Sequence, residues 1–167
     1  MTARVIPALR PMLPADAPVL AAIFRASIEE LTGDDYTPAQ QAAWASSADD
    51  EDAFAGRLAK DLTLVATIAR ESAGFASLKG KDHIEMLYVH PRAARQGIGT
   101  ALCDALEVLA ASRTAKSITL DASDTAQPFF ARRGYTAIRR NLVAINGEAL
   151  GNVSMKKPLA ARTEAPQ

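Results

Sequence analysis

Residues 89–102 carry the pattern in this sequence that most clearly suggests chemistry. A β-rich run ends near residue 89, a basic loop follows, and Gly97 and Gly99 then open an amphipathic segment with helical periodicity. The first backbone amides of a helix have no intrahelical acceptor, and glycines let an anion approach them without a Cβ in the way. The pattern therefore predicts that this turn binds a phosphate or diphosphate group.

Two familiar phosphate-binding motifs are absent from the sequence. No GxxxxGK[ST] run occurs, and Gly97-Ile98-Gly99 lacks the third glycine of GxGxxG, which disfavours nucleotide hydrolysis and hydride transfer. The alternative is structural: the two glycines would then only allow a tight turn from strand to helix.

Composition limits the kinds of partner. The chain has 167 residues, which fit one domain, and its 19 basic residues balance 19 acidic ones. A net charge of zero argues against general affinity for nucleic acid or acidic membranes. We expect one domain over residues 1–158 and a flexible tail over residues 159–167, where alanine, proline and polar residues dominate.

Cysteine and hydrophobic content favour a cytoplasmic protein without a metal site. Cys103 is the only cysteine, so no internal disulfide can form and no CxxC motif exists. The N-terminal residues lack the apolar core of a secretory signal, and no stretch approaches the roughly 18 apolar residues of a membrane span. The acidic residues 49–52 are better explained by the start of a helix than by a metal cluster.

The elements that must position the glycine turn follow from hydrophobic periodicity. Thr37-Pro38 predicts the cap and first residue of a helix, and Asn146-Gly147 predicts a hairpin turn. Helices are predicted around residues 19–28, 38–44, 49–60, 97–112 and 125–133, and strands around residues 5–9, 62–68, 74–78, 83–89, 117–121, 135–145 and 152–156.

Two segments resemble a known family. The acetyl-CoA motif of the GNAT superfamily of N-acetyltransferases, V-x-P followed by [QR]-x-x-G-x-[GA], is matched at Val89, Pro91, Gly97 and Gly99. Residues 122–135 look like the second cofactor segment of that superfamily, and residues 87–91 are more narrowly similar to its YafP-like branch. One position departs from the motif, because Ala94 stands where Gln or Arg is usual.

The resemblance implies a fold and a co-substrate. The fold is a mixed, mostly antiparallel α/β sheet of about seven strands flanked by helices, with splayed fourth and fifth strands. The co-substrate is acetyl-CoA, with no metal, and its pantetheine arm lies between the splayed strands. The residues implied to contact the coenzyme are Leu87, Tyr88, Val89, Arg95, Gln96, Gly97, Ile98, Gly99, Thr100, Ser123, Phe129, Phe130, Arg132 and Arg133.

Several of these residues have a structural alternative. Ser123, like Asp124, can cap the helix that follows, and Phe129 and Phe130 can pack in the core. The two arginines can equally be solvated cations at a helix end.

A general base is needed, because an attacking amine must lose a proton. Glu85 is the first candidate, and His83 could relay protons for it or replace it. Strand alternation places His83, Glu85, Leu87 and Val89 on one side, near the Leu87 amide that the resemblance implies as donor to the thioester carbonyl. The alternative is that Glu85 pairs with a neighbouring cation and His83 caps a strand end.

The group that protonates the leaving thiolate is not obvious from the sequence. The family commonly uses a tyrosine where this chain has Phe130, so Tyr88 and Tyr135 are substitutes by residue type, and water is another source. Cys103 has no local histidine partner, which disfavours a covalent cysteine intermediate. We therefore expect direct acetyl transfer to a primary amine, with a non-catalytic acyl-CoA-binding or regulatory module as the alternative.

The resemblance places acceptor recognition on the first two helices and their connection. Tyr36, Trp44 and Glu85 are the candidate acceptor contacts, with ordinary helix packing as the alternative for Trp44. The implied partner is a small-molecule or peptide amine, without nucleic acid or membrane, and the protein is expected to be a monomer or homodimer.

Overall fold

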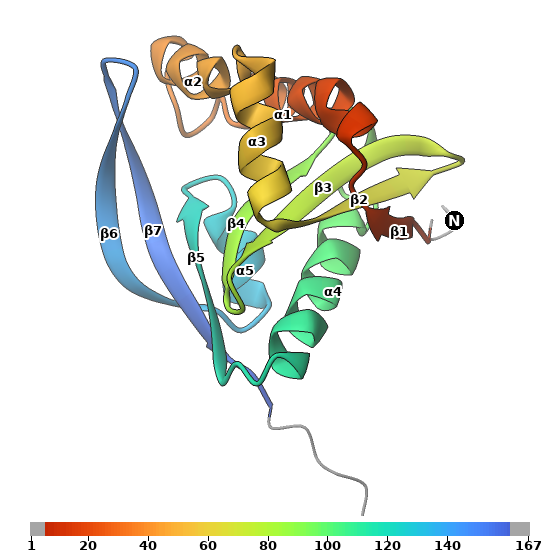
Figure 1. Cartoon of the computed structure of the whole chain (residues 1–167). Helices are drawn as coiled ribbons and strands as arrows, with labels where there is room; N and C mark the ends of the chain where they lie inside the picture. Colours follow the sequence, from red (N-terminus) through yellow and green to blue (C-terminus); the bar gives the residue numbers. More distant parts are fainter. Residues whose placement is uncertain (1–5, 161–167) are drawn as a thin grey trace, which may run out of the picture.

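Seven strands form one central sheet, and helices cover both of its faces (Figure 1). The computed structural model describes residues 6–160. The strand order is β1-β2-β3-β4-β5-β7-β6, and every neighbouring pair is antiparallel except β4 and β5, which are parallel. The predicted mixed, mostly antiparallel sheet is thus confirmed. The strands are β1 (Ala8–Pro11), β2 (Leu62–Ile68), β3 (Glu71–Lys79), β4 (His83–Val89), β5 (Ser117–Ser123), β6 (Thr136–Ile145) and β7 (Glu148–Pro158).

Two hydrophobic clusters join the helices to the sheet. One cluster lies beneath the N-terminal helices and includes Phe24, Phe54, Phe75 and Met86. The other lies beneath the later helices and includes Ile98, Leu102, Leu106, Ile118 and Leu120. The α-helices are α1 (Ala17–Leu31), α2 (Pro38–Ala45), α3 (Glu51–Lys60), α4 (Ile98–Ser112) and α5 (Gln127–Arg132), with 3₁₀ turns η1 (Pro14–Asp16), η2 (Ser46–Ala48) and η3 (Pro91–Ala93).

Local signals explain where the N-terminal helices begin. The Thr37 hydroxyl accepts a hydrogen bond from the Gln40 amide at 3.1 Å, and the Gln40 side chain accepts one from the Thr37 amide at 2.9 Å. This reciprocal cap, with Pro38 in the first turn, confirms the predicted start of α2. The acidic run at residues 49–52 begins α3, where Asp50 accepts from the Ala53 amide at 3.0 Å.

Gly74 allows α4 to lie close to the sheet. A Cβ at this position would come within 3.0 Å of the Ile98 Cγ2 and within 3.0 Å of the Tyr88 carbonyl oxygen. Such contacts are too short for an unshifted structure, so the absence of a side chain on β3 sets the depth at which the first turn of α4 packs.

Some predicted boundaries are wrong. The first strand is Ala8–Pro11, and residue 5, its predicted start, lies outside the described residues. The last helix, α5, begins two residues later than predicted, because residues 123–126 form a capped turn. The last strand starts at Glu148 rather than near residue 152. Backbone pairing with both β5 and β6 stabilises β7, so its first residues form a strand without a run of apolar side chains.

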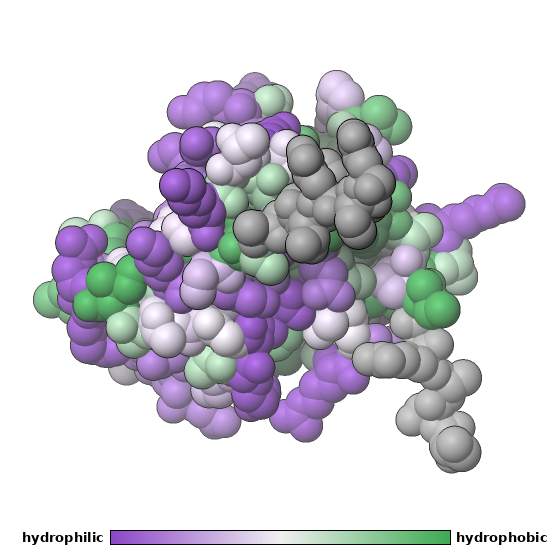
Figure 2. Space-filling view, turned by 90° about the horizontal axis from the view of Figure 1, so that it is seen from below, coloured by the Kyte–Doolittle hydropathy of each residue, from purple (hydrophilic) through white to green (hydrophobic). Residues whose placement is uncertain are grey.

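The described chain continues into the predicted tail. The Leu159 amide donates to the Lys116 carbonyl at 2.8 Å, and its side chain packs against the core. The rest of that predicted segment, residues 161–167, lies outside the described residues. On the face seen from below, hydrophilic residues predominate and hydrophobic residues form separate spots (Figure 2).

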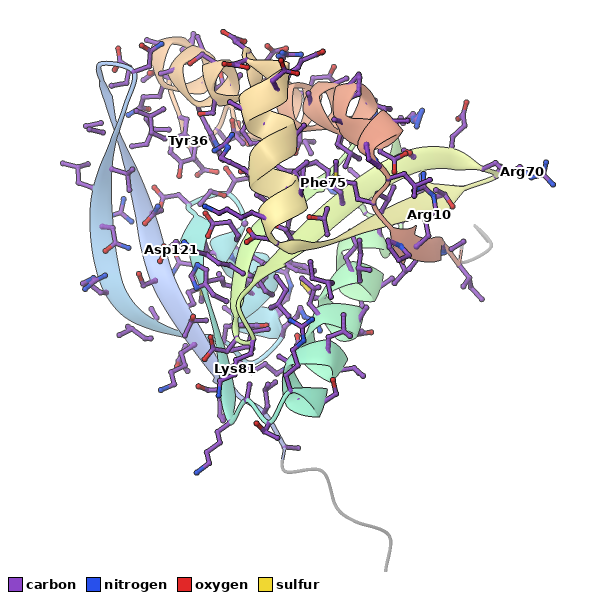
Figure 3. All side chains as sticks on the ribbon, in the orientation of Figure 1. Arg10, Tyr36, Arg70, Phe75, Lys81 and Asp121 are labelled. Atoms are coloured by element: carbon purple, nitrogen blue, oxygen red, sulfur yellow. The ribbon has the colours of Figure 1, made fainter. Side chains whose placement is uncertain are left out.

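A single buried hydroxyl joins the N-terminal helices to the far side of the sheet. Tyr36 is only 5% exposed, and its hydroxyl donates to the Gly151 carbonyl at 2.7 Å while accepting from the Asp124 amide at 2.9 Å. Burial raises the pKa of this phenol. The connection between α1 and α2 is thereby fixed to the end of β5 and to β7 (Figure 3).

We expect Tyr36→Phe to lower the free energy of unfolding by about 1–3 kcal/mol, because it leaves a partly buried carbonyl and a partly buried amide without their partner. Urea unfolding at neutral pH measures the loss. Thr125→Val is the control: it removes an exposed hydroxyl that donates to Asp35 at 2.7 Å between the same two segments, and it should cost less than about 0.5 kcal/mol. Equal losses in the two variants would contradict the role of Tyr36.

Candidate functional site

Strands β4 and β5 separate soon after they meet. Only His83 and Ile84 of β4 pair with β5, opposite Thr119 and Leu120. Beyond this point β4 continues against β3, and β5 continues against β7 as far as residue 123. The facing backbone edges of residues 85–89 and 121–123 are therefore unpaired with each other, which creates a gap inside the sheet.

A β-bulge at Glu85 changes which side chains face which side. On β3, Leu78 pairs with Ile84 and Ser77 pairs with Met86, so Glu85 is an extra residue without a partner. Ile84 belongs to the cluster beneath α4, whereas Met86 belongs to the cluster beneath α1. The bulge thus reverses the alternation of side chains.

The prediction that alternation places His83, Glu85, Leu87 and Val89 on one side is wrong. Leu87 and Val89 pack against the cluster beneath α4. His83 and Glu85 lie within 3.6 Å of each other (Nε2 to Oε2). His83 pairs with Lys79 one step beyond the Leu78–Ile84 pair, so it faces away from the α4 cluster. The sequence could not show this shift, because residues 86–89 are all apolar or aromatic and both faces of β4 are covered, so neither phase of alternation stands out.

Backbone groups of Leu87 point into the gap. The His90 amide bonds to the Ala73 carbonyl at 2.8 Å, and Tyr88 pairs with Phe75 in the same register. In an antiparallel pair, alternate residues direct both their N–H and C=O groups to the partner strand. The even-numbered residues of this stretch therefore face β3, and the N–H and C=O of Leu87 face the open side.

The first turn of α4 presents free amides. Gly97 caps the helix with a φ of 85°, and Arg95 has a φ of 62°, so both lie in the left-handed region. The first bond of the helix runs from the Ala101 amide to the Gly97 carbonyl at 3.0 Å. Within residues 6–160, no group accepts a hydrogen bond from the amides of residues 98–100, so three donors point outward at the positive end of the helix dipole.

A cleft of about 780 Å³ connects the gap with these amides. Its walls come from α1, α2, β4, β5, α5 and the start of α4. The predicted site residues that line it are Trp44, Glu85, Leu87, Tyr88, Val89, Arg95, Gly97, Ile98, Gly99, Thr100, Ser123, Phe129, Phe130, Arg132 and Arg133.

Three predicted site residues do not line the cleft. Tyr36 is buried beside it and uses its hydroxyl on two backbone groups. Gln96 is exposed and donates to the Arg92 carbonyl at 3.3 Å. His83 lies behind Glu85, with its Nδ1 2.8 Å from the Thr119 hydroxyl.

The two arginines at the C-terminal end of α5 have different surroundings. Arg133 is held by Asp104 at 2.8 Å and by Glu107 at 2.7 Å, and its side chain is 13% exposed. Lys157 also binds Glu107, at 2.6 Å, so this network ties α5 to α4 and β7. Arg132 is exposed and forms no ion pair with any described residue, which leaves it available to a ligand in the cleft.

Ser123 and Asp124, both predicted as possible caps of the helix that follows, play different parts. The Ser123 hydroxyl accepts from the Ala126 amide at 3.1 Å. Asp124 instead pairs with Arg140 through two contacts of 2.9 and 3.1 Å. Ser123 therefore shapes the turn before α5, and Asp124 ties that turn to β6.

Tyr88 lies in an aromatic cluster on the α1 side of the cleft. Its ring centroid lies 4.6 Å from that of Phe24, 5.7 Å from Phe75 and 6.3 Å from Trp44. Burial raises the pKa of Tyr88 to about 12, so its hydroxyl keeps its proton at neutral pH. Phe130 is buried against Phe129 and Tyr135, with centroids 5.1 and 5.3 Å away, as expected for a core residue.

The fold, the gap and the free amides agree with comparisons to known proteins. The family described as an acetyltransferase (GNAT) domain matches residues 32–157. The chain belongs to the GNAT family of acetyltransferases. It is therefore an acyl-CoA-dependent N-acetyltransferase. This family membership favours the predicted enzyme over the alternative of a non-catalytic binding module.

Individual relatives support this assignment. The chain is 33% identical over 148 residues to the uncharacterized N-acetyltransferase YafP of Escherichia coli K12, covering 89% of this chain and 93% of YafP. A GCN5-related N-acetyltransferase from Rhodopseudomonas palustris is 59% identical with a TM-score of 0.93, covering 95% of this chain and 99% of that one. PaiA N-acetyltransferase from Thermoplasma acidophilum, solved with coenzyme A, shares the fold at 15% identity with a TM-score of 0.74, covering 92% and 99%.

Two kinds of feature are absent from residues 6–160. No group of three or more histidine, cysteine, aspartate or glutamate side chains is arranged to hold a metal ion there. No helix in that part of the chain has both the length and the apolar character to cross a membrane.

Asp121, which was not among the predicted site residues, lines the cleft on β5 just beyond the last pair with β4. The Ser154 hydroxyl donates to its Oδ1 at 2.6 Å. One indication of such a role is present in the sequence, because Asp121 is the last residue of the strand predicted over residues 117–121. Without the pairing of β4 with β5, however, nothing in the sequence connected it to Glu85.

We expect Tyr88 to resist ionisation near pH 10, where an exposed tyrosine is half ionised. Ultraviolet titration of phenolate in the native protein should show a step near pH 12 that disappears in Tyr88→Phe. Because the folded pKa is raised, the contribution of Tyr88 to stability is complete below about pH 10 and is lost as the pH rises toward about 12. Ionisation of Tyr88 near pH 10 in the folded protein would contradict this.

Proposed function

We propose that the protein transfers the acetyl group of acetyl-CoA to a primary amine by direct attack of that amine. The observation that carries the proposal is the cleft that joins the open backbone edge of Leu87 to the free amides of α4. A ligand with a thioester at one end and phosphates at the other matches this pair of features.

The α4 turn supplies the anion-binding end. The amides of residues 98–100 would donate to the diphosphate, Gly97 keeps the approach open, and Arg95 and Arg132 add positive charge at the edge of the cleft. Arg133 is already held by two carboxylates, so its proposed role is to orient α5 rather than to bind phosphate itself.

Leu87 supplies the donor at the reacting end. Its N–H would bond to the thioester carbonyl oxygen, which gains negative charge as the amine attacks. The Leu87 amide is already oriented for this task, because the residues before and after it are held by their pairing with β3. No side chain at position 87 is needed, which is consistent with a leucine that packs toward the core.

Glu85 is the proposed general base. It lines the cleft beside the Leu87 amide, and its side chain is 41% exposed, so it can take a proton from the amine directly or through water. His83, whose Nε2 is 3.6 Å away, orients this carboxylate from behind and does not line the cleft.

Direct attack agrees with the state of Cys103. The thiol is buried in the core, and burial raises its pKa to about 12, so it does not offer a thiolate near neutral pH. As the C–S bond of the thioester breaks, the coenzyme leaves as a thiolate. It gains a proton from the Tyr88 hydroxyl or from water, since Phe130 has none to give.

Gly97→Ala should raise the dissociation constant for coenzyme A about tenfold or more, because an alanine at φ 85° strains the turn that presents the amides. Isothermal titration calorimetry measures the change. Gly147→Ala is a matched control, with a φ of 83° and equally open surroundings in the β6–β7 turn. Both variants should lose similar stability, and only Gly97→Ala should lose affinity; unchanged affinity would contradict the proposed site.

Glu85→Gln should lower kcat by about 10²–10⁴-fold while leaving coenzyme A affinity unchanged, because the variant binds normally but cannot accept a proton. The assay measures free thiol released from acetyl-CoA with a panel of primary amines. The loss should shrink at high pH, where more of the amine is already neutral. Asp82→Asn removes an exposed charge outside the cleft and serves as the control.

Two outcomes of this assay would contradict the proposal. Thiol release by the wild type that does not depend on any added amine would exclude amine acetylation as the reaction. A Glu85→Gln variant with wild-type kcat across the pH range would exclude this residue as the base.

A further inference from the structure

Charges are separated along the cleft. Its arginines, Arg95, Arg132 and Arg133, come from the α4 turn and from α5. Its carboxylates, Glu85 and Asp121, come from the two strands that part to form the gap. The proposed coenzyme site uses the positive part, so the negative part faces the acceptor.

Glu85 and Asp121 follow the last paired residues of their strands. Ile84 and Leu120 form that last pair, so the next residue on each strand is an acid. Leu120 and Ala122 pack into the cluster beneath α4, which places Asp121 on the opposite face, toward the N-terminal helices. Glu85 contacts His83 on that same face, where the His83 ring also meets Thr119 of β5.

A chain of hydrogen bonds holds Asp121 in place. Arg139 Nε donates to Asn141 Oδ1 at 2.9 Å, and Asn141 Nδ2 donates to the Ser154 oxygen at 2.8 Å. Ser154 in turn donates to Asp121 Oδ1 at 2.6 Å. This chain crosses β6, β7 and β5 and ends at the cleft, and Figure 3 labels Asp121 on β5.

The carboxylate of Asp121 is not neutralised from within the described chain. No lysine or arginine among residues 6–160 pairs with it, and the only ion pair of Glu85 is with His83. The chain of hydrogen bonds uses Oδ1, which leaves Oδ2 without a hydrogen-bond partner among these residues. A fixed, unpaired carboxylate in a cleft favours a cationic ligand group.

We propose that Asp121 is a specificity-determining residue that binds a second ammonium group of the acceptor, so that the preferred acceptor is a diamine or polyamine. This inference rests on the proposed function: Glu85 receives the proton of the amine that reacts, and Asp121 holds a separate group that keeps its charge. Two carboxylates on adjacent strands match two amines of one acceptor better than they match a single amine.

The test compares diamines with monoamines of the same chain length: putrescine with butylamine, and cadaverine with pentylamine. Calorimetry measures binding of each amine to the protein saturated with coenzyme A, and the thiol assay measures kcat/KM. Asp121→Asn removes the charge but keeps an oxygen for Ser154, and Ser154→Ala keeps the charge but releases the carboxylate. Asp82→Asn is the charge control, and thermal unfolding checks that each variant is folded.

We expect the wild type to prefer each diamine about tenfold or more, and Asp121→Asn to lose most of that preference with unchanged coenzyme A affinity. Ser154→Ala should lose a smaller part of it. Equal losses for diamines and monoamines, or no loss, would overturn the proposal, as would a wild type without a preference. If the wild type acetylates no amine, the proposed function fails, whereas the binding comparison still decides whether Asp121 selects a second charge.

Discussion

The loss of pairing between β4 and β5 beyond Ile84 and Leu120 is the constraint on which the rest of the structure depends. Backbone N–H and C=O groups inside a sheet need partners, and here one edge of β4 has none from the protein. The bulge at Glu85 coincides with the point of divergence. A sheet opened in this way offers a ready hydrogen-bonding edge to an extended ligand, which is why the proposed reaction is assigned to it.

An open sheet must be secured elsewhere. Every residue of β4 except Glu85 pairs with β3, and every residue of β5 pairs with β7, so each side of the gap is an antiparallel unit. Gly74 lets α4 pack closely beneath one side. On the other side, the ion pairs of Glu107 join α4 to α5 and β7. Helix α4 therefore spans the gap beneath the sheet and holds its two walls together.

Features set by neighbouring residues could be predicted from the sequence, whereas features set by distant residues could not. The Thr37 cap, the Asn146-Gly147 hairpin and the glycine turn before α4 depend on a few adjacent residues, and each lies where it was predicted. The bulge at Glu85 and the use of the Tyr36 hydroxyl depend on pairing across the sheet. The part played by Asp121 in the cleft depends on strand order, which periodicity along one segment does not encode.

The Tyr36 hydroxyl has a consequence for how the acceptor reaches the cleft. It fixes the α1–α2 connection to Asp124, which follows the last residue of β5 and lies in the turn before α5. An outward movement of that connection would break two partly buried hydrogen bonds at once. These bonds oppose an outward movement of the connection, so under the proposed function the acceptor would be selected by the shape and charge of a preformed cleft rather than by closure around the bound molecule.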